Sequence, residues 1–212
     1  ALPLLDLDEP TLHMVFRAND SPFSGQEGTM VTARQVRDRL RLELQTNVAM
    51  KVEESGEEYI VSGRGLLHLG ILLENMRREG FELAVGKPRV IFRQANGVRT
   101  EPMEFLTLDV PNEHMGTAME LLGERKAELE KMEPRGGRTH LEYIVPARGL
   151  IGLSGRMMTA THGEALMHHR YHCYGPHRGP IGGRNFGVMI ATEKGAVTAY
   201  ALDQLSDRGI MF

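Results

Sequence analysis

The chain has 212 residues, 41% of them hydrophobic and 25% charged, a composition typical of a soluble globular protein with one large domain or two small ones. No run of about 18 apolar residues occurs, so no membrane span is predicted, and these residues contain no signal peptide. The single cysteine, Cys173, excludes an intrachain disulfide and is consistent with a reducing, cytoplasmic setting.

The net charge of −3 hides an uneven distribution. Residues 135–184 contain seven arginines, no lysine and two glutamates, which gives this stretch +5 and leaves −8 for the rest. The same stretch holds six of the nine histidines. Such asymmetry is typical of a surface that meets an anionic partner, although a scattered, solvated set of charges would give the same count.

Periodicity and turn residues predict a first domain with the order β-α-β-β-α-β, the split βαβ or ferredoxin-like pattern. Thr32 is expected to cap the first helix, Val36, Leu40 and Leu44 to share its buried face, and Asn47 to end it. The predicted elements are a strand at 11–18, this helix, strands at 48–52 and 59–61, a helix at 66–79 ended by Gly80, and a strand at 81–85.

The second half predicts the same order. Residues 127–132 could prolong the preceding helix or form a strand, and the match to the first domain favours the strand. The predicted elements are a strand at 103–110, a helix from Met115, the strand before Pro134, a strand at 139–145, a helix at 150–161 and a strand at 164–171. A Gly/Pro-rich loop at 175–184 follows, and two strands at 186–191 and 196–202 would begin a further β-rich domain.

A nine-residue repeat ties the two halves together. Residues 58–66 and 142–150 agree at seven of nine positions and include Arg64-Gly65 and Arg148-Gly149. We therefore predict an α+β fold with two tandem ferredoxin-like domains at 1–95 and 96–175 and the start of a third at 176–212. The two glycines are expected in equivalent turns that need positive φ or close approach, and the two arginines in a shared structural role.

Arginine offers planar, multi-donor contacts suited to phosphate, so exposed arginines are candidate RNA contacts. The first helix carries a stripe of Arg34, Arg37 and Arg41, which could instead be a solvated face paired with acids such as Asp38. The candidates of the basic half are Arg135 and Arg138, both expected to be exposed beside the Gly136-Gly137 turn, together with Arg156, Arg178 and Arg184.

The cluster His168, His169, His172, Cys173 and His177 contains good zinc ligands. Adjacent strand residues point to opposite faces, however, and no Cys-x-x-Cys or His-Glu-x-x-His pattern accompanies them. A histidine-rich surface strand is therefore the preferred interpretation, and His168, His172, Cys173 and His177 remain the metal-ligand alternative.

Catalytic motifs are absent from the sequence. Gly86-Lys87 is followed by Pro88, so no P-loop occurs, and there is no Gly-x-Ser-x-Gly elbow. We therefore expect the chain to be non-catalytic and to bind no cofactor.

Several motifs resemble the BipA/TypA family of translational GTPases, and the resemblance extends over essentially the whole chain. They are Asp8-Glu9-Pro10-Thr11-Leu12, Asn19-Asp20-Ser21-Pro22-Phe23, Arg37-Asp38-Arg39-Leu40, Thr46-Asn47-Val48-Ala49, Gly63-Arg64-Gly65-Leu66-Leu67-His68-Leu69, Val145-Pro146-Ala147-Arg148-Gly149-Leu150 and Asp207-Arg208-Gly209.

The resemblance implies two domains corresponding to domains III and V of elongation factor G. It also implies a monomeric, cytoplasmic parent protein that acts on the ribosome, in ribosome assembly and stress adaptation. GTP and Mg²⁺ would be bound by a GTPase domain preceding this chain, and the partners would be the ribosome, with its rRNA and ribosomal proteins, and that GTPase domain. Two alternatives are a small-molecule-binding regulatory pair of ferredoxin-like domains and a histidine-cluster metalloenzyme.

Overall fold

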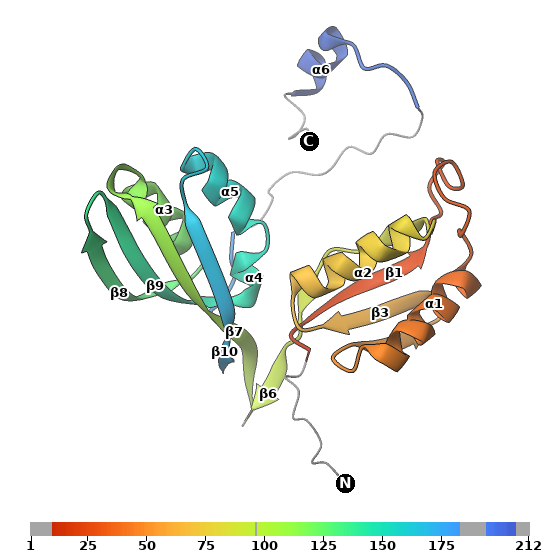
Figure 1. Ribbon diagram of the computed structural model, residues 1–212, viewed down its shortest axis with the longest axis horizontal. Coiled ribbons are helices and arrows are strands. Elements are labelled where there is room, and N and C mark those ends of the chain that lie inside the picture. Colours follow the sequence, from red (N-terminus) through yellow and green to blue (C-terminus); the bar gives the residue numbers. More distant parts are fainter. Residues whose placement is uncertain (1–9, 96, 183–193, 207–212) are drawn as a thin grey trace. The chain divides into compact units, whose positions relative to one another are not determined.

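The structure is a computed structural model that describes residues 10–95, 97–182 and 194–206 (Figure 1). It contains two compact units, one that includes Ala1–Lys87 and one formed by Pro88–Gly182. The division thus falls at 87/88, earlier than the predicted boundary at 95/96. None of the helices in the described ranges is long and apolar enough to cross a membrane.

The first unit has the predicted order of elements. They are β1 (Leu12–Ala18), α1 (Ala33–Thr46), β2 (Lys51–Ser55), β3 (Glu58–Gly63), α2 (Leu66–Arg78) and β4 (Leu83–Val85). The four strands form an antiparallel sheet in the order β2-β3-β1-β4, which is the ferredoxin-like arrangement. Both helices pack on one face of this sheet (Figure 1), where Phe16, Val61 and Leu69 are fully buried.

Local sequence signals explain where α1 begins and which face it buries. Thr32 caps the helix, and Gln35 returns a bond to the backbone of Thr32, so a capping box is formed. Val36 and Leu40 are buried as predicted. Two expectations are wrong: Leu44 is exposed at the surface, and the second strand begins only at Lys51, leaving Val48 78% exposed.

The second unit repeats the order with longer strands. Its elements are β5 (Arg89–Val90), β6 (Arg93–Ala95), β7 (Val98–Pro111), η1 (Asn112–His114), α3 (Met115–Glu124), β8 (Glu128–Arg135), β9 (Arg138–Pro146), α4 (Ala147–Leu150), α5 (Leu153–Ala160) and β10 (Leu166–Pro176). The sheet order is β10-β7-β9-β8, all antiparallel, and β6 pairs antiparallel with the first three residues of β7. Strand β8 confirms the strand alternative for the region around 127–132.

The helix predicted at 150–161 is two helices. Ile151 has extended backbone, with ψ 116°, and Gly152 has φ 71°, a conformation that favours glycine and ends α4 before α5 begins. Helices α3 and α5 still cover one face of the sheet, because Leu122, Leu153 and Met157 pack onto Leu106 and Leu141 in the core.

The strand predicted at 196–202 is also wrong, because Ala199–Ser206 forms helix α6. Alanine and leucine favour helix, and Thr198 Oγ1 accepts a hydrogen bond from the backbone N–H of Ala201 at 3.3 Å, as a helix cap does. The strand predicted at 186–191 lies outside the described residues.

Candidate nucleic-acid interface

The repeated turn of the second unit holds an ion pair. Arg148, in α4, donates from Nε to Oε2 of Glu101 and from Nη2 to Oε1 at 3.0 Å. Glu101 is fully buried and the Arg148 side chain is 17% exposed. Burial raises the pKa of Glu101, but hydrogen bonds from Arg148 and from the backbone N–H of Arg178 outweigh burial, so the pKa of this carboxyl lies below its ordinary value. In the first unit, by contrast, the side chain of Arg64 is exposed.

The two repeat glycines are not under the same constraint. Gly65 has extended backbone, with φ −175°, and an added Cβ would meet nothing within 4 Å. Gly149 lies within α4, and its Cβ would come 3.0 Å from the carbonyl oxygen of Arg125 and 3.2 Å from Cγ2 of Val145. Positive φ is therefore wrong for both glycines, and close approach applies to Gly149 alone.

Arg178, a predicted RNA contact, is bonded within the second unit. Its Nη1 donates to the carbonyl oxygens of Lys126 at 2.9 Å and Ile144 at 3.0 Å, and its Nη2 donates to Oε2 of Glu128 at 2.7 Å. Its backbone N–H donates to Oε1 of Glu101 at 2.8 Å. The guanidinium thus fastens residue 178 to β8 and β9. Arg184 lies outside the described residues.

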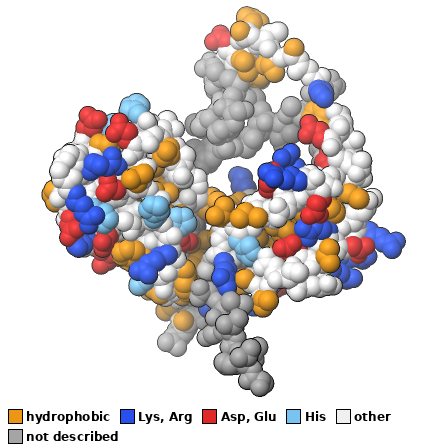
Figure 2. All heavy atoms as spheres, viewed as in Figure 1, with side chains coloured by type: hydrophobic (Ala, Val, Ile, Leu, Met, Phe, Trp, Pro, Cys, Tyr) orange, Lys and Arg blue, Asp and Glu red, His pale blue; other side chains and the backbone are white. Residues whose placement is uncertain are grey.

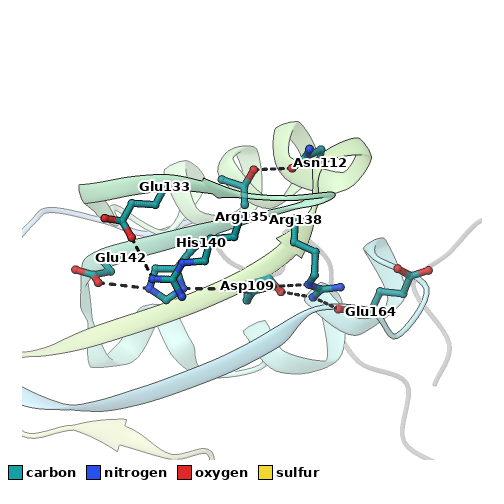
Figure 3. A network of polar contacts seen from close by, with 9 residues as sticks. Asp109, Asn112, Glu133, Arg135, Arg138, His140, Glu142 and Glu164 are labelled. Carbon is teal, nitrogen blue, oxygen red and sulfur yellow. Dashed lines mark hydrogen bonds and ion pairs between the residues drawn. The ribbon is translucent and has the colours of Figure 1, made fainter.

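Arg138 belongs to a polar network on the sheet of the second unit (Figure 3). Its Nε donates to Oδ1 of Asp109 at 2.5 Å, and its Nη2 donates to the carbonyl oxygens of Asp109 and Glu164 at 2.9 and 2.8 Å. His140 lies between Oδ2 of Asp109, at 3.8 Å, and Oε1 of Glu142, at 3.4 Å. The expectation that Arg138 projects freely from its turn is therefore wrong, since its side chain is only 36% exposed.

Arg135, at the other side of the Gly136-Gly137 turn, is exposed as expected. Its side chain is 56% exposed, and Nη2 lies 3.0 Å from Oε2 of Glu133 (Figure 3). An exposed pair of this kind contributes little to stability, so the guanidinium can exchange its carboxylate for another anion at small cost.

Acidic neighbours also accompany the arginine stripe of α1. Arg34 and Arg37 lie 3.8 and 3.4 Å from the carboxylate of Asp38, and Arg41 lies 2.8 Å from that of Glu54. This geometry agrees with the solvated, acid-paired alternative.

Arg99, Arg156 and Arg170, also in the second unit, have no carboxylate partner among the described residues. Arg156 is exposed on α5, Arg170 lies over the ring of Phe105 at 5.3 Å, and Arg99 lies over the ring of Phe92 at 3.7 Å. Figure 2 shows how closely basic and acidic side chains alternate elsewhere on the visible face of this unit. Sequence reasoning did not single out Arg99 and Arg170. For Arg170 the sequence held a signal of an unpaired charge, because the five residues between Glu164 and Arg170 include no acidic residue.

The histidine cluster lies along β10 and just after it, and β7 is the strand that β10 pairs with among the described residues. His168, His172 and Cys173 are exposed, and His177 is half-buried, with its ring 5.6 Å from that of Phe92. No group of three or more potential ligands that could hold a metal occurs in the part of the chain that the structure describes.

His169 has a different environment from its histidine neighbours. Its Nδ1 lies 2.5 Å from Oε2 of Glu104, and this hydrogen bond, which outweighs partial burial, raises the pKa of His169. The histidine is thereby held on one face of β10 as an ion-pair partner.

Comparison with known proteins gives consistent matches. Residues 98–183 match the family described as Elongation factor G C-terminus. Proteins called large ribosomal subunit assembly factor BipA are 53% identical in Synechocystis sp., 51% in Salmonella typhimurium and 48% in Bacillus subtilis, each over the whole of this chain. The chain spans 35–36% of the length of these relatives.

The fold agrees with these matches, since two ferredoxin-like units follow one another and the second carries the matched segment. The chain belongs to the BipA/TypA family.

Proposed function

We propose that this chain is the ribosome-binding, non-catalytic part of a translational GTPase that acts in assembly of the large ribosomal subunit and in stress adaptation. The two ferredoxin-like units are rigid adaptors that connect a GTPase domain elsewhere in the parent protein to ribosomal RNA. The names of the relatives, which call them assembly factors of the large subunit, support the ribosome as partner.

The observation that carries the proposal is that three exposed arginines of the second unit have no carboxylate partner among the described residues. Arg99, Arg156 and Arg170 keep their charge available, whereas Arg138 and Arg178 use their guanidinium groups to hold the unit together. RNA binding depends on neutralising phosphates, and guanidinium groups next to aromatic rings also suit stacking with exposed bases. Arg135, whose ion pair is exposed, is a further contact in this proposal.

The chain itself performs no hydrolysis in this proposal. It contains no P-loop, so GTP and Mg²⁺ bind to the part of the parent that lies outside these residues. The parent acts as a cytoplasmic monomer, and its ribosome affinity comes from rRNA and ribosomal-protein contacts of several domains.

A ribosome pelleting assay with the full-length parent tests the proposal. We expect the triple substitution R99A/R156A/R170A to weaken association and to reduce the log–log salt slope by about 0.7 to 0.9 for each phosphate that is no longer neutralised. The fold should persist, because changes of exposed charge usually alter stability by less than about 0.5 kcal/mol.

The matched control is R34A/R37A/R41A, which removes the same number of charges from the first unit, to which this proposal assigns no RNA contact. This control should leave the salt slope unchanged. An unchanged slope in R99A/R156A/R170A, or an equal reduction in the control, would contradict the assignment of RNA contacts to the second unit.

A further inference from the structure

Helix α2 is apolar on two sides. Leu69, Leu72 and Met76 are buried against the sheet of the first unit, as an amphipathic helix requires. On the other side Leu67 is 76% exposed and Ile71, one helical turn later, is 52% exposed. A helix that is hydrophobic on both sides is normally buried on both, so the outer side of α2 is suited to contact with protein.

The exposed side of α2 borders a hollow of about 640 Å³ within the first unit. Val48, Leu67 and Ile71 form its apolar wall, and Arg64, His68 and Asn47 form its polar end. Figure 2 shows hydrophobic side chains gathered near the N-terminal end of α2. The hollow thus joins an aliphatic surface to a cationic group.

In the second unit, the side chain of Arg125 occupies the position that corresponds to Asn47 in the first unit. Asn47 and Arg125 are the residues that end the first helix of each unit. Arg125 is 9% exposed and reaches the repeated turn, where Nη1 donates to the carbonyl oxygens of Gly149 at 2.5 Å and Ile151 at 3.2 Å. The shorter side chain of Asn47 instead contacts Nε2 of His68, at 2.7 Å, and donates to Oε1 of Glu43, at 3.2 Å. The residue that ends the first helix therefore bonds to the repeated turn in the second unit, whereas in the first unit it lines the hollow.

The charge at the polar end indicates what could enter. The side chain of Arg64 is exposed and has no carboxylate partner among the described residues, whereas Glu43 is engaged by Arg39 and Asn47. An occupant with an aliphatic or aromatic side chain next to a carboxylate would satisfy both the wall and Arg64.

We propose that this hollow is the docking site for an apolar, acid-flanked segment of the same polypeptide that lies outside these 212 residues. The inference rests on the proposed function, in which the chain is part of a longer protein, and the relatives are about three times as long as this chain. A few aliphatic side chains are too small a contact for a stable dimer, which needs more than about 1,000 Å² of buried surface. A tethered segment needs less contact, because its effective concentration reaches the millimolar range.

Photo-cross-linking in the isolated full-length parent tests this site. Benzoylphenylalanine replaces Leu67 in one variant and Leu42 in the control; Leu42 is also exposed in the first unit, at 57%, but does not line the hollow. Irradiation of the Leu67 variant should join residue 67 to a peptide outside this chain within a monomer, and R64E should reduce the yield about tenfold. The Leu42 variant should give no such product.

Absence of an intramolecular product from position 67, or an equal yield from position 42, overturns the docking site. A product only between two copies, or only with ribosomal protein or RNA after ribosomes are added, also overturns it. Ribosome pelleting of the same preparations separates this inference from the proposed function: a parent that pellets normally but gives no intramolecular product refutes the docking site alone, and a parent that cross-links but does not pellet refutes ribosome binding alone.

Discussion

Arg148 and Glu101 form a two-pronged ion pair in the second unit, whereas Arg64, at the same position of the repeat in the first unit, has no carboxylate partner among the described residues. Leu12 pairs with Gly63 and Met103 with Pro146, so continuing each register places Thr11 opposite Arg64 and Glu101 opposite Arg148. Thr11 Oγ1 donates to the carbonyl oxygen of Arg64 at 2.8 Å, whereas Glu101 binds the guanidinium of Arg148. The Arg-Gly turn therefore makes a different contact in each unit, because the residue opposite the arginine is Thr11 in the first unit and Glu101 in the second.

Breaking this pair from either side should strongly destabilise the second unit. We expect R148A to lower the free energy of unfolding by about 3 to 5 kcal/mol, because it leaves the buried carboxylate of Glu101 without its cation. Denaturant unfolding followed by circular dichroism measures the effect. R64A is the matched control and should cost less than about 0.5 kcal/mol; similar destabilisation in both variants would show that the ion pair does not distinguish the repeats.

The same carboxyl should contribute to acid sensitivity. The pKa of Glu101 is lower in the folded protein than the ordinary value of 4.5, so its contribution to stability is complete above about pH 4.5 and is lost as the pH falls through the lower folded value. We expect E101Q to be less stable than the unsubstituted chain at about pH 7. It should also lose less stability between about pH 5 and about pH 3, the range in which Glu101 takes up its proton. Unfolding curves across this range check it; parallel acid destabilisation in both proteins would contradict the assignment.

The two repeat glycines should respond differently to alanine. G149A should cost about 1 to 3 kcal/mol, because its Cβ would press on the backbone of Arg125 and on the branched side chain of Val145. G65A meets open space and extended backbone, so only the weaker capping preference of alanine applies, a destabilisation below about 1 kcal/mol. Thermal unfolding of both variants measures the two destabilisations, and equal values for G149A and G65A would contradict this prediction.

The start of α1 offers an independent test in the first unit. T32A should cost about 1 kcal/mol, because the side chain of Thr32 accepts the backbone N–H of Gln35 at 3.3 Å. Q35A removes the return bond to the backbone N–H of Thr32, at 3.0 Å, and should cost less, since this bond is exposed and competes with water. A larger effect of Q35A than of T32A, measured by denaturant unfolding, would reverse this order.

Sequence patterns predicted the elements of both units well, because hydrophobic periodicity and turn residues act over a few positions. Thr32 and Asn47 bound α1, and the repeat correctly favoured a strand at β8. Patterns failed where one residue overrode its neighbours, as at Gly152, whose positive φ splits α4 from α5, and at Ala199–Ser206, where helix propensity and the Thr198 cap outweigh an alternating pattern.

The candidate contacts divide in the same way. The sequence by itself determined the tandem ferredoxin-like order, the basic half and the family, since each depends on residue types along the chain. Only the tertiary structure decided which arginines are available. Arg138 and Arg178 are bound to Asp109 and Glu128, residues about 30 and 50 positions away, whereas Arg170 faces a ring. Guanidinium pairing depends on distances between strands that meet only after folding, and for that reason the sequence could not show that Arg138 and Arg178 are engaged within the unit.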